Sequence, residues 1–224
     1  ATSDAFAEDP VRVLRTARFA ARYGFTIAAD TVGLMRAIAP ELVHVPQERI
    51  WAEFEKGLSE RNPARMFEAL EYCDALWITP LAPYRKWLYK LRDVVDSTPM
   101  HARFALVAAG FTDGDYERCK IPTHFSRIAK AYNNHRDDLA DYGRLDKEKR
   151  LDLLTSLKAL NDNQLINAVL DVLAVELPLA ASAARCSIEA DVECLGKLDC
   201  AAIVAADPKN AKTLIREARL GVLQ

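Results

Sequence analysis

Apolar residues recur at steps of three and four along most of the chain, and strict alternation of apolar and polar residues is rare. Such steps place apolar side chains on one face of an α-helix, whereas alternation would indicate a strand. Only eight glycines interrupt the pattern. The sequence therefore predicts an all-α, multi-helical protein.

Helix-end signals place four helices in the first third of the chain. The first begins at Pro10, with Asp9 as its N-cap, and ends near Tyr23, where Gly24 stops it. The other three cover 30–38, 46–60 and 62–76, and open with Asp30, Pro46 and Asn62-Pro63.

The segment "WITPLAP" (77–83) contains two prolines and predicts a break in the helical pattern. We take it as a domain boundary, with one domain over 1–80 and a second over 81–224. Further helices are expected near 84–95, 100–109, 123–142, 146–159, 161–176, 188–196 and 209–222.

The first helix concentrates four arginines, at positions 12, 15, 18 and 22. At about 100° per residue they occupy an arc of roughly 120°. The opposite side carries apolar residues expected to face a core: Val13, Leu14, Ala17, Ala20 and Ala21. The pattern alone is typical of a solvated amphipathic helix. Four arginines without a lysine nevertheless favour recognition of carboxylates, phosphates or base edges, which guanidinium groups bind in a two-pronged way.

Composition limits the remaining choices. Half of the 224 residues are apolar and the net charge is −2, so we expect a buried core and only a local nucleic-acid surface. The five cysteines form no CxxC pair, which indicates a reducing compartment and argues against zinc and disulfides. No long apolar run or signal peptide is visible, so we expect a cytoplasmic protein that does not enter a membrane.

The segment "EDPVRVLRTARFAARYGF" (8–25) resembles the neck motif of class II tRNA nucleotidyltransferases, the CCA-adding enzymes, which share it with bacterial poly(A) polymerases. The matching positions are Glu8, Asp9, Arg12, Arg15, Arg18, Phe19, Gly24 and Phe25. The resemblance continues through "LMRAI", "ERIWAEFEKGLSERNPARMFEAL" and "CDAL", and covers 4–76. It implies that 1–80 forms the neck and body of such an enzyme.

The resemblance implies that Asp9 and Arg12 form a protein template for the incoming base. A carboxylate accepts and a guanidinium donates, which suits the exocyclic amine and ring nitrogen of cytosine and adenine. Uracil and guanine present the reverse pattern and would be rejected. Arg15 is implied as a further nucleotide contact, while Glu8, Arg18 and Arg22 either brace this site or touch RNA.

The family's catalytic head holds two Mg²⁺ on paired carboxylates, and it would precede residue 1. We therefore expect this chain to carry no catalytic residue or metal ligand and to be inactive alone, with the head supplied by the same gene or another chain. Asp113-Gly114-Asp115 lacks an upstream Gly-rich turn and a strand pattern, so we interpret it as a loop or helix start.

The second domain resembles an HD-type phosphohydrolase domain that has lost its chemistry. "HARFALVAAGFTD" (101–113) is similar to the signature helix, but Ala109-Gly110 stands where the metal-binding His-Asp would be. Of the metal set only His135 remains, and a lone imidazole is a poor metal site. We expect a degenerate HD-like helical tail.

The segment "YRKWLYKLR" (84–92) interleaves basic and aromatic residues. Arg85, Lys86 and Lys90 are candidate phosphate contacts with tRNA. A helical period places Arg85, Tyr89 and Arg92 on one face. A solvated basic face fits the pattern equally well.

Together these features predict the nucleotide-selecting and tRNA-binding part of an enzyme that adds CCA to tRNA 3′ ends from CTP and ATP, gripping the acceptor arm. Mg²⁺ would act in the complete enzyme only. The alternatives are a poly(A) polymerase fragment and a non-catalytic helical RNA-binding module.

Overall fold

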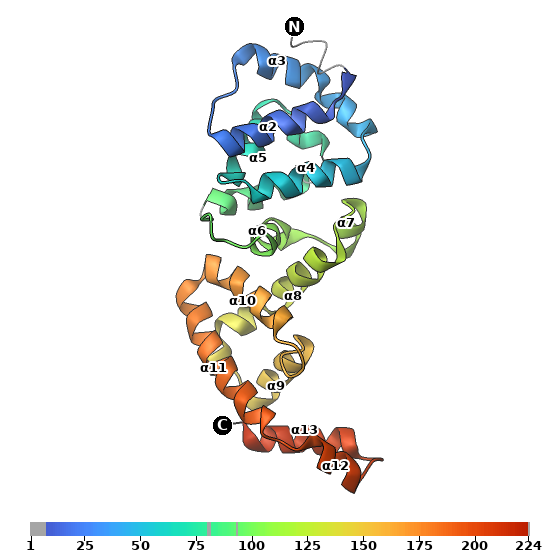
Figure 1. Cartoon of the computed structure of the whole chain (residues 1–224), viewed down its shortest axis with the longest axis vertical. Helices are drawn as coiled ribbons and strands as arrows, with labels where there is room; N and C mark the ends of the chain where they lie inside the picture. Colours follow the sequence, from blue (N-terminus) through green and yellow to red (C-terminus); the bar gives the residue numbers. More distant parts are fainter. Residues whose placement is uncertain (1–7, 80–81, 93, 224) are drawn as a thin grey trace. The chain divides into compact units, whose positions relative to one another are not determined.

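The computed structural model describes residues 8–79, 82–92 and 94–223, except for the side chains of 82–85 and 87. All regular structure in these residues is helical (Figure 1), which confirms the all-α prediction. The α-helices are α2 (Val11–Tyr23), α3 (Ala29–Ile38), α4 (Gln47–Ser59), α5 (Pro63–Tyr72), α6 (Met100–Val107), α7 (Asp113–Arg118), α8 (Thr123–Ala140), α9 (Lys147–Ser156), α10 (Gln164–Glu176), α11 (Pro178–Gly196), α12 (Cys200–Ala206) and α13 (Ala211–Val222). The 3₁₀ helices are η1 (Ala39–His44), η2 (Leu76–Ile78), η3 (Ala82–Arg92), η4 (Ala108–Gly110) and η5 (Tyr142–Arg144).

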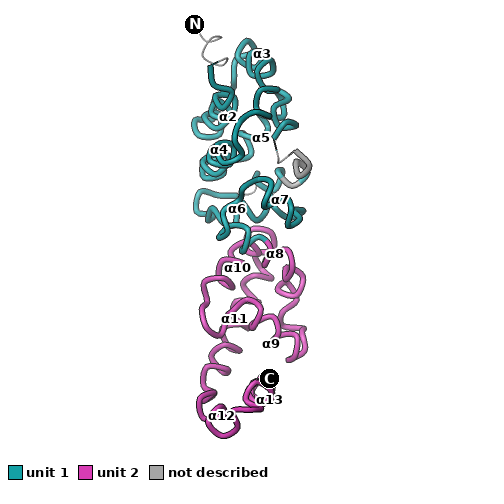
Figure 2. The backbone as a smooth tube through the Cα atoms, turned by 90° about the vertical axis from the view of Figure 1, so that its right-hand side faces the viewer, with its two compact units in different colours: residues 1–129 teal, residues 130–224 magenta. Residues whose placement is uncertain are grey.

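The chain forms two compact units, residues 1–129 and 130–224 (Figure 2). This division lies well beyond the proline-containing segment 77–83 where the sequence places the domain boundary. The difference arises because the residues that follow this segment fold back onto the first helices.

The core of the first unit forms around α2, which packs against α4 and α5 (Figure 1). The predicted apolar face is confirmed, because all five of its residues are buried: Val13, Leu14, Ala17, Ala20 and Ala21. Between α4 and α5, Gly57 lets Met66 approach closely: a Cβ at Gly57 would lie 2.0 Å from the Met66 sulfur. Any larger residue there would displace the Met66 side chain from its buried position.

Arg103 ties the later part of the first unit to its start. This side chain from α6 is almost fully buried, and burial lowers the pKa of its guanidinium. The guanidinium donates to the carbonyl oxygens of Leu58 (2.8 Å) and Glu60 (2.7 Å) at the end of α4. It also donates to the carbonyl oxygens of the turn before α6, at Val95, Asp96 and Thr98. The helix end and the turn are thereby satisfied by one side chain.

An aromatic cluster strengthens the same connection. The rings of Trp51 and Phe104 meet edge to face at 5.3 Å, and Phe125 lies 5.6 Å from both. Such contacts add to the free energy gained by burying the rings. Residues 100–129 therefore complete the core of the first unit.

Several predicted helix ends need correction. Asp30 lies in the first turn of α3 and makes no capping hydrogen bond, because the helix begins one residue earlier, at Ala29. The predicted helix 62–76 ends at Tyr72, since Asp74 takes a left-handed conformation with φ of 59°. α11 begins at Pro178, not 188, because its first turns are rich in alanine, the strongest helix former. α12 lies outside every predicted helix.

The second unit is built around α10 and α11, which pack against each other. Two buried tyrosines of this unit donate hydrogen bonds to carboxylates on α10 and α11. Tyr142 donates to Asp191 (2.8 Å), and Arg150 pairs with the same carboxylate at 3.0 Å. Tyr132 and Arg136 converge in the same way on Glu176.

Candidate nucleotide-binding site

The carboxylate of Asp9 is oriented at the start of α2 by two donors. The backbone N–H of Val11 donates to Oδ1 at 3.2 Å. The Arg49 guanidinium, from α4, donates to Oδ2 at 3.0 Å. Although α2 itself begins at Val11, Asp9 therefore makes the hydrogen bond expected of an N-cap. A carboxylate has about four acceptor positions, so Asp9 retains capacity for a further donor.

Arg12 lies one turn further along the same helix. Its guanidinium is 3.7 Å from Glu8, and its side chain is 43% exposed. Asp9 and Arg12 form no ion pair with each other among the described residues, since each has another partner. The two groups are nonetheless both accessible at the same end of α2, a carboxylate acceptor beside a guanidinium donor.

Arg49 is a site residue that sequence reasoning missed. It follows Pro46 at the start of α4, and nothing in "PQERIW" distinguishes it from an ordinary exposed arginine. Its role depends on the packing of α2 against α4, which brings positions 40 residues apart together.

Arg18 differs from the other arginines of α2 because its side chain is only 11% exposed. It donates to Glu53 at 2.9 Å and to Glu60 at 3.3 Å, both at the α4 side. Arg18 stands at the edge of the predicted arc, next to buried Leu14, which explains its burial. These contacts fit bracing of α2 better than contact with RNA.

Arg15 and Arg22 are exposed on α2. Neither forms an ion pair with a carboxylate in the part of the chain that the structure describes. They leave two guanidinium groups available on the outer face of α2, at positions three and ten residues beyond Arg12.

The predicted RNA contacts on η3 are only partly described. The side chain of Arg85 lies outside the described residues, while Lys86 is exposed and Lys90 is half-buried. Because η3 is a 3₁₀ helix with three residues per turn, Tyr89 shares a row with Lys86 and Arg92 rather than with Arg85. The predicted face is therefore corrected by one residue.

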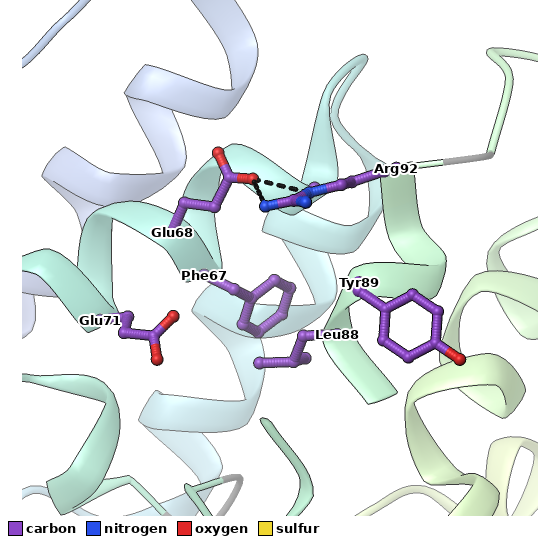
Figure 3. A pocket seen from close by; sticks show the side chains of 7 residues that line it. Phe67, Glu68, Glu71, Leu88, Tyr89 and Arg92 are labelled. Atoms are coloured by element: carbon purple, nitrogen blue, oxygen red, sulfur yellow. Dashed lines mark hydrogen bonds and ion pairs between the residues drawn. The ribbon is translucent and has the colours of Figure 1, made fainter. Parts of the chain in front are cut away.

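A small cavity of about 100 Å³ lies between α5 and η3. Figure 3 shows Glu68 and Arg92 joined above Phe67, with the Tyr89 ring to the right of Phe67. Arg92 donates to Glu68 at 2.8 and 3.0 Å. This pair fixes η3 on α5 and occupies a guanidinium that could otherwise meet phosphate.

The structure also places the residues that the sequence analysis discussed in the predicted second domain. Ala109 and Gly110 lie in η4, and His135 on α8 contacts the Ser156 hydroxyl at 3.1 Å. Asp115 opens α7: it accepts from the Thr112 N–H at 2.8 Å in a capping box, which confirms the predicted helix start. Among the described residues, no group of three His, Cys, Asp or Glu side chains could hold a metal ion.

Comparison with known proteins identifies the first part of the chain. Residues 24–79 match the family described as the probable RNA and SrmB-binding site of polymerase A. A stretch of 76 residues is 58% identical to the Multifunctional CCA protein of Neisseria meningitidis serogroup C, covering 33% of this chain and 18% of that protein. The matched part of the chain is therefore similar to proteins of the CCA-adding and poly(A) polymerase family.

Other relatives agree. A stretch of 78 residues is 55% identical to the Multifunctional CCA protein of Neisseria gonorrhoeae, covering 34% of this chain and 19% of that protein. For the protein of the same name from Cupriavidus metallidurans, 77 residues are 57% identical, with 33% and 19% coverage. The chain spans about a fifth of the length of these relatives. No solved structure matches it, so the HD-like character of the tail stays a prediction.

Within the described residues, no helix has the length and apolar character required to cross a membrane.

Proposed function

We propose that this chain is the nucleotide-selecting and tRNA-binding part of a tRNA nucleotidyltransferase that adds CCA to tRNA 3′ ends from CTP and ATP. The observation that carries the proposal is the accessible pair of Asp9 and Arg12 at the start of α2. The relatives named Multifunctional CCA protein support it.

Base selection follows from the direction of the hydrogen bonds. Asp9 accepts from the exocyclic amine of cytosine or adenine, and Arg12 donates to the neighbouring ring nitrogen. Uracil and guanine place an acceptor opposite Asp9 and a donor opposite Arg12, so both contacts are lost and the base is rejected.

Arg49 serves this chemistry as a positioning residue. Its guanidinium holds the Asp9 carboxylate at 3.0 Å while the Val11 N–H holds the other oxygen. Because the Asp9 carboxylate is already fixed, it loses little conformational entropy when a base binds. It also cannot rotate to adapt its hydrogen bonds to a mismatched base.

The phosphoryl chemistry belongs to a catalytic head outside this chain, which would bind Mg²⁺ and supply the metal-assisted attack. The residues of this chain bind, orient and discriminate. Arg15 contributes a cation for the nucleotide phosphates or sugar, and the exposed Lys86 and the half-buried Lys90 of η3 face the tRNA acceptor arm. The chain alone should therefore extend no tRNA in the presence of Mg²⁺, CTP and ATP.

The test of base selection uses a chimera in which residues 1–129 of this chain, the complete first unit, replace the corresponding part of the Neisseria meningitidis protein. Asp9→Asn keeps an N-cap acceptor for Val11 but removes the charge and the Oδ2 acceptor that Arg49 uses. A lost charge-assisted hydrogen bond costs about 1.5–3 kcal/mol, so incorporation of UTP and GTP relative to CTP and ATP should rise roughly ten- to a hundredfold.

Asp30→Asn is the matched control, because Asp30 lies in the first turn of α3 and makes no cap. It should leave incorporation unchanged. If Asp9→Asn also left nucleotide choice unchanged while α2 stayed folded, Asp9 would be a helix cap only and the proposal would fail.

The second candidate is a poly(A) polymerase, favoured by the description of the family matched at residues 24–79. The borrowed head of the chimera would bias this choice, so an assay of the chain joined to the head encoded with it distinguishes the two. A CCA-adding enzyme incorporates C before A and stops, whereas a poly(A) polymerase extends with ATP alone. A joined protein that binds RNA and extends with neither nucleotide would instead favour a non-catalytic RNA-binding module.

A further inference from the structure

Three aromatic rings follow one another at the end of α2, the half-buried Phe19 and the exposed Tyr23 and Phe25, and we call them the aromatic step. The ring centres of Phe19 and Tyr23 are 6.0 Å apart, and those of Tyr23 and Phe25 are 6.5 Å apart. The last two rings are almost parallel, with an angle of 14° between their planes. Tyr23 is 64% exposed and Phe25 is 42% exposed, unusually high for adjoining aromatic residues.

The backbone fixes this arrangement. Gly24 adopts a left-handed conformation with φ of 71°, and its N–H donates to the Ala20 carbonyl oxygen at 3.0 Å. That turn reverses the chain at the helix end and brings Phe25 beside Tyr23. The Arg65 guanidinium from α5 then donates to the Phe25 carbonyl oxygen at 3.2 Å. The rings therefore stand on a turn held from two sides.

Positive charge accompanies the rings. The Arg22 guanidinium lies 5.3 Å from the centre of the Tyr23 ring, and Arg18 lies 4.7 Å from Phe19. Arg15 and Arg22 are exposed, and neither is neutralised by a carboxylate among the described residues. The aromatic rings offer flat apolar faces, and the neighbouring guanidinium groups offer positive charge. A suitable ligand is therefore planar and also carries negative charge.

We propose that the aromatic step is a stacking platform for the unpaired bases of single-stranded RNA, with Arg22 meeting the phosphates. This inference rests on the proposed RNA-binding function and adds a site distinct from the base-selecting pair at the other end of α2. Stacking on aromatic side chains is tolerant of sequence, and arginine adds both a phosphate contact and a planar group. A cavity of about 150 Å³ next to Phe25, lined also by Val32 and Tyr72, extends the apolar surface.

The test measures binding of the full 224-residue chain to two probes: a 12-nucleotide single-stranded RNA with one 2-aminopurine, and a blunt RNA duplex of equal length. Tyr23→Leu removes the ring but keeps apolar bulk, and Tyr23→Phe, the matched control, keeps the ring. Loss of one stacked base weakens binding by roughly five- to a hundredfold. Tyr23→Leu should therefore weaken single-strand binding and abolish the 2-aminopurine quench, while Tyr23→Phe stays within about twofold of wild type.

Binding to the duplex and the dependence of binding on salt concentration distinguish base stacking from electrostatic attraction. Tyr23→Leu should leave duplex binding and the salt dependence unchanged. Arg22→Gln should weaken binding of both probes and lower the salt slope by about one. Phe25→Leu provides a second variant of the platform, and circular dichroism verifies that each variant keeps its helices.

The outcomes are distinct. If the wild-type chain binds neither RNA nor tRNA, the proposed function fails. If it binds RNA but Tyr23→Leu and Phe25→Leu bind the single strand as wild type does, the platform is overturned while the proposed function stands. If these variants keep RNA binding but lose binding to SrmB, which the family description names, the aromatic step is a protein interface, and this also overturns the proposal.

Discussion

The two units of this chain differ in the kind of polar side chain that is buried in their hydrogen-bonded clusters. In the first unit the buried group is an arginine: Arg18 meets two carboxylates, and Arg103 meets five backbone carbonyls. In the second unit the buried group is a tyrosine hydroxyl, and a carboxylate joins it to a more exposed arginine. Tyr132 with Glu176 and the 39% exposed Arg136 is the clearest example, and Tyr142 with Asp191 and Arg150 is the second.

This difference predicts that a single substitution of the buried polar residue destabilises the two units to different extents. A buried guanidinium is always charged, so removing its partner or the guanidinium itself leaves charge without compensation. A phenol is neutral, and its loss leaves a carboxylate that its arginine still neutralises. The first unit should therefore depend more steeply on a single side chain than the second.

Replacing Arg18 should have the largest effect. Arg18→Met keeps much of the side-chain volume but leaves Glu60 without its cation and Glu53 with only the exposed Lys56, and should lower the free energy of unfolding by about 3–5 kcal/mol. All three tryptophans, at positions 51, 77 and 87, lie in the first unit. Tryptophan fluorescence in urea therefore reports this unit alone. Arg15→Met, on the same helix but exposed, should change the midpoint little; equal losses in both variants would contradict the comparison.

Removing the Tyr142 hydroxyl should have an intermediate effect. Tyr142→Phe deletes one hydrogen bond to a charged acceptor, worth about 1.5–3 kcal/mol. Amide hydrogen exchange of α10 and α11 should speed up accordingly, with α2 and α4 unaffected. Tyr89→Phe is the control, because Tyr89 is an exposed tyrosine of the first unit. A loss as large as that of Arg18→Met would remove the distinction between the units.

Alkaline pH should weaken the second unit selectively. Burial, and then the hydrogen bonds to Asp191 and Glu176, raise the pKa of Tyr142 and Tyr132. Since the folded state holds these protons more tightly, the stabilisation is complete below the unfolded pKa of about 10 and declines as pH rises above it. Each tyrosine contributes a slope of up to about 1.4 kcal/mol per pH unit. Hydrogen exchange between pH 9 and 11 should show a shallower dependence for Tyr142→Phe than for wild type.

Arg49 should matter least for stability. Its pair with Asp9 is exposed, and such pairs contribute about 0–1 kcal/mol. Arg49→Gln should leave the urea midpoint of the first unit nearly unchanged. In the chimera described above it should nevertheless relax nucleotide choice, because Asp9 loses its orienting partner. An unaltered preference for CTP and ATP would show that Val11 alone positions Asp9.

Local signals were enough for the helices but not for their partners. The apolar period, Pro63 and Gly24 predicted α2 to α5 within a few residues, because each signal acts within one turn. Arg18 and Arg49 could not be interpreted in this way. Whether an arginine is buried against Glu53 or exposed beside Asp9 depends on which helix packs over it, and that depends on contacts 35 to 40 residues apart.

The hydrogen bonds of Arg103 imply that the end of the segment matched by the family differs from the end of the folded unit. The family match ends at residue 79, but the last carbonyls of α4 find their donors on α6. A fragment excised at residue 79 would expose those carbonyls, along with the Trp51 face that Phe104 and Phe125 cover. The smallest autonomous folding unit therefore extends to about residue 129. Any transplant of the RNA-binding region into another protein should carry α6 with it.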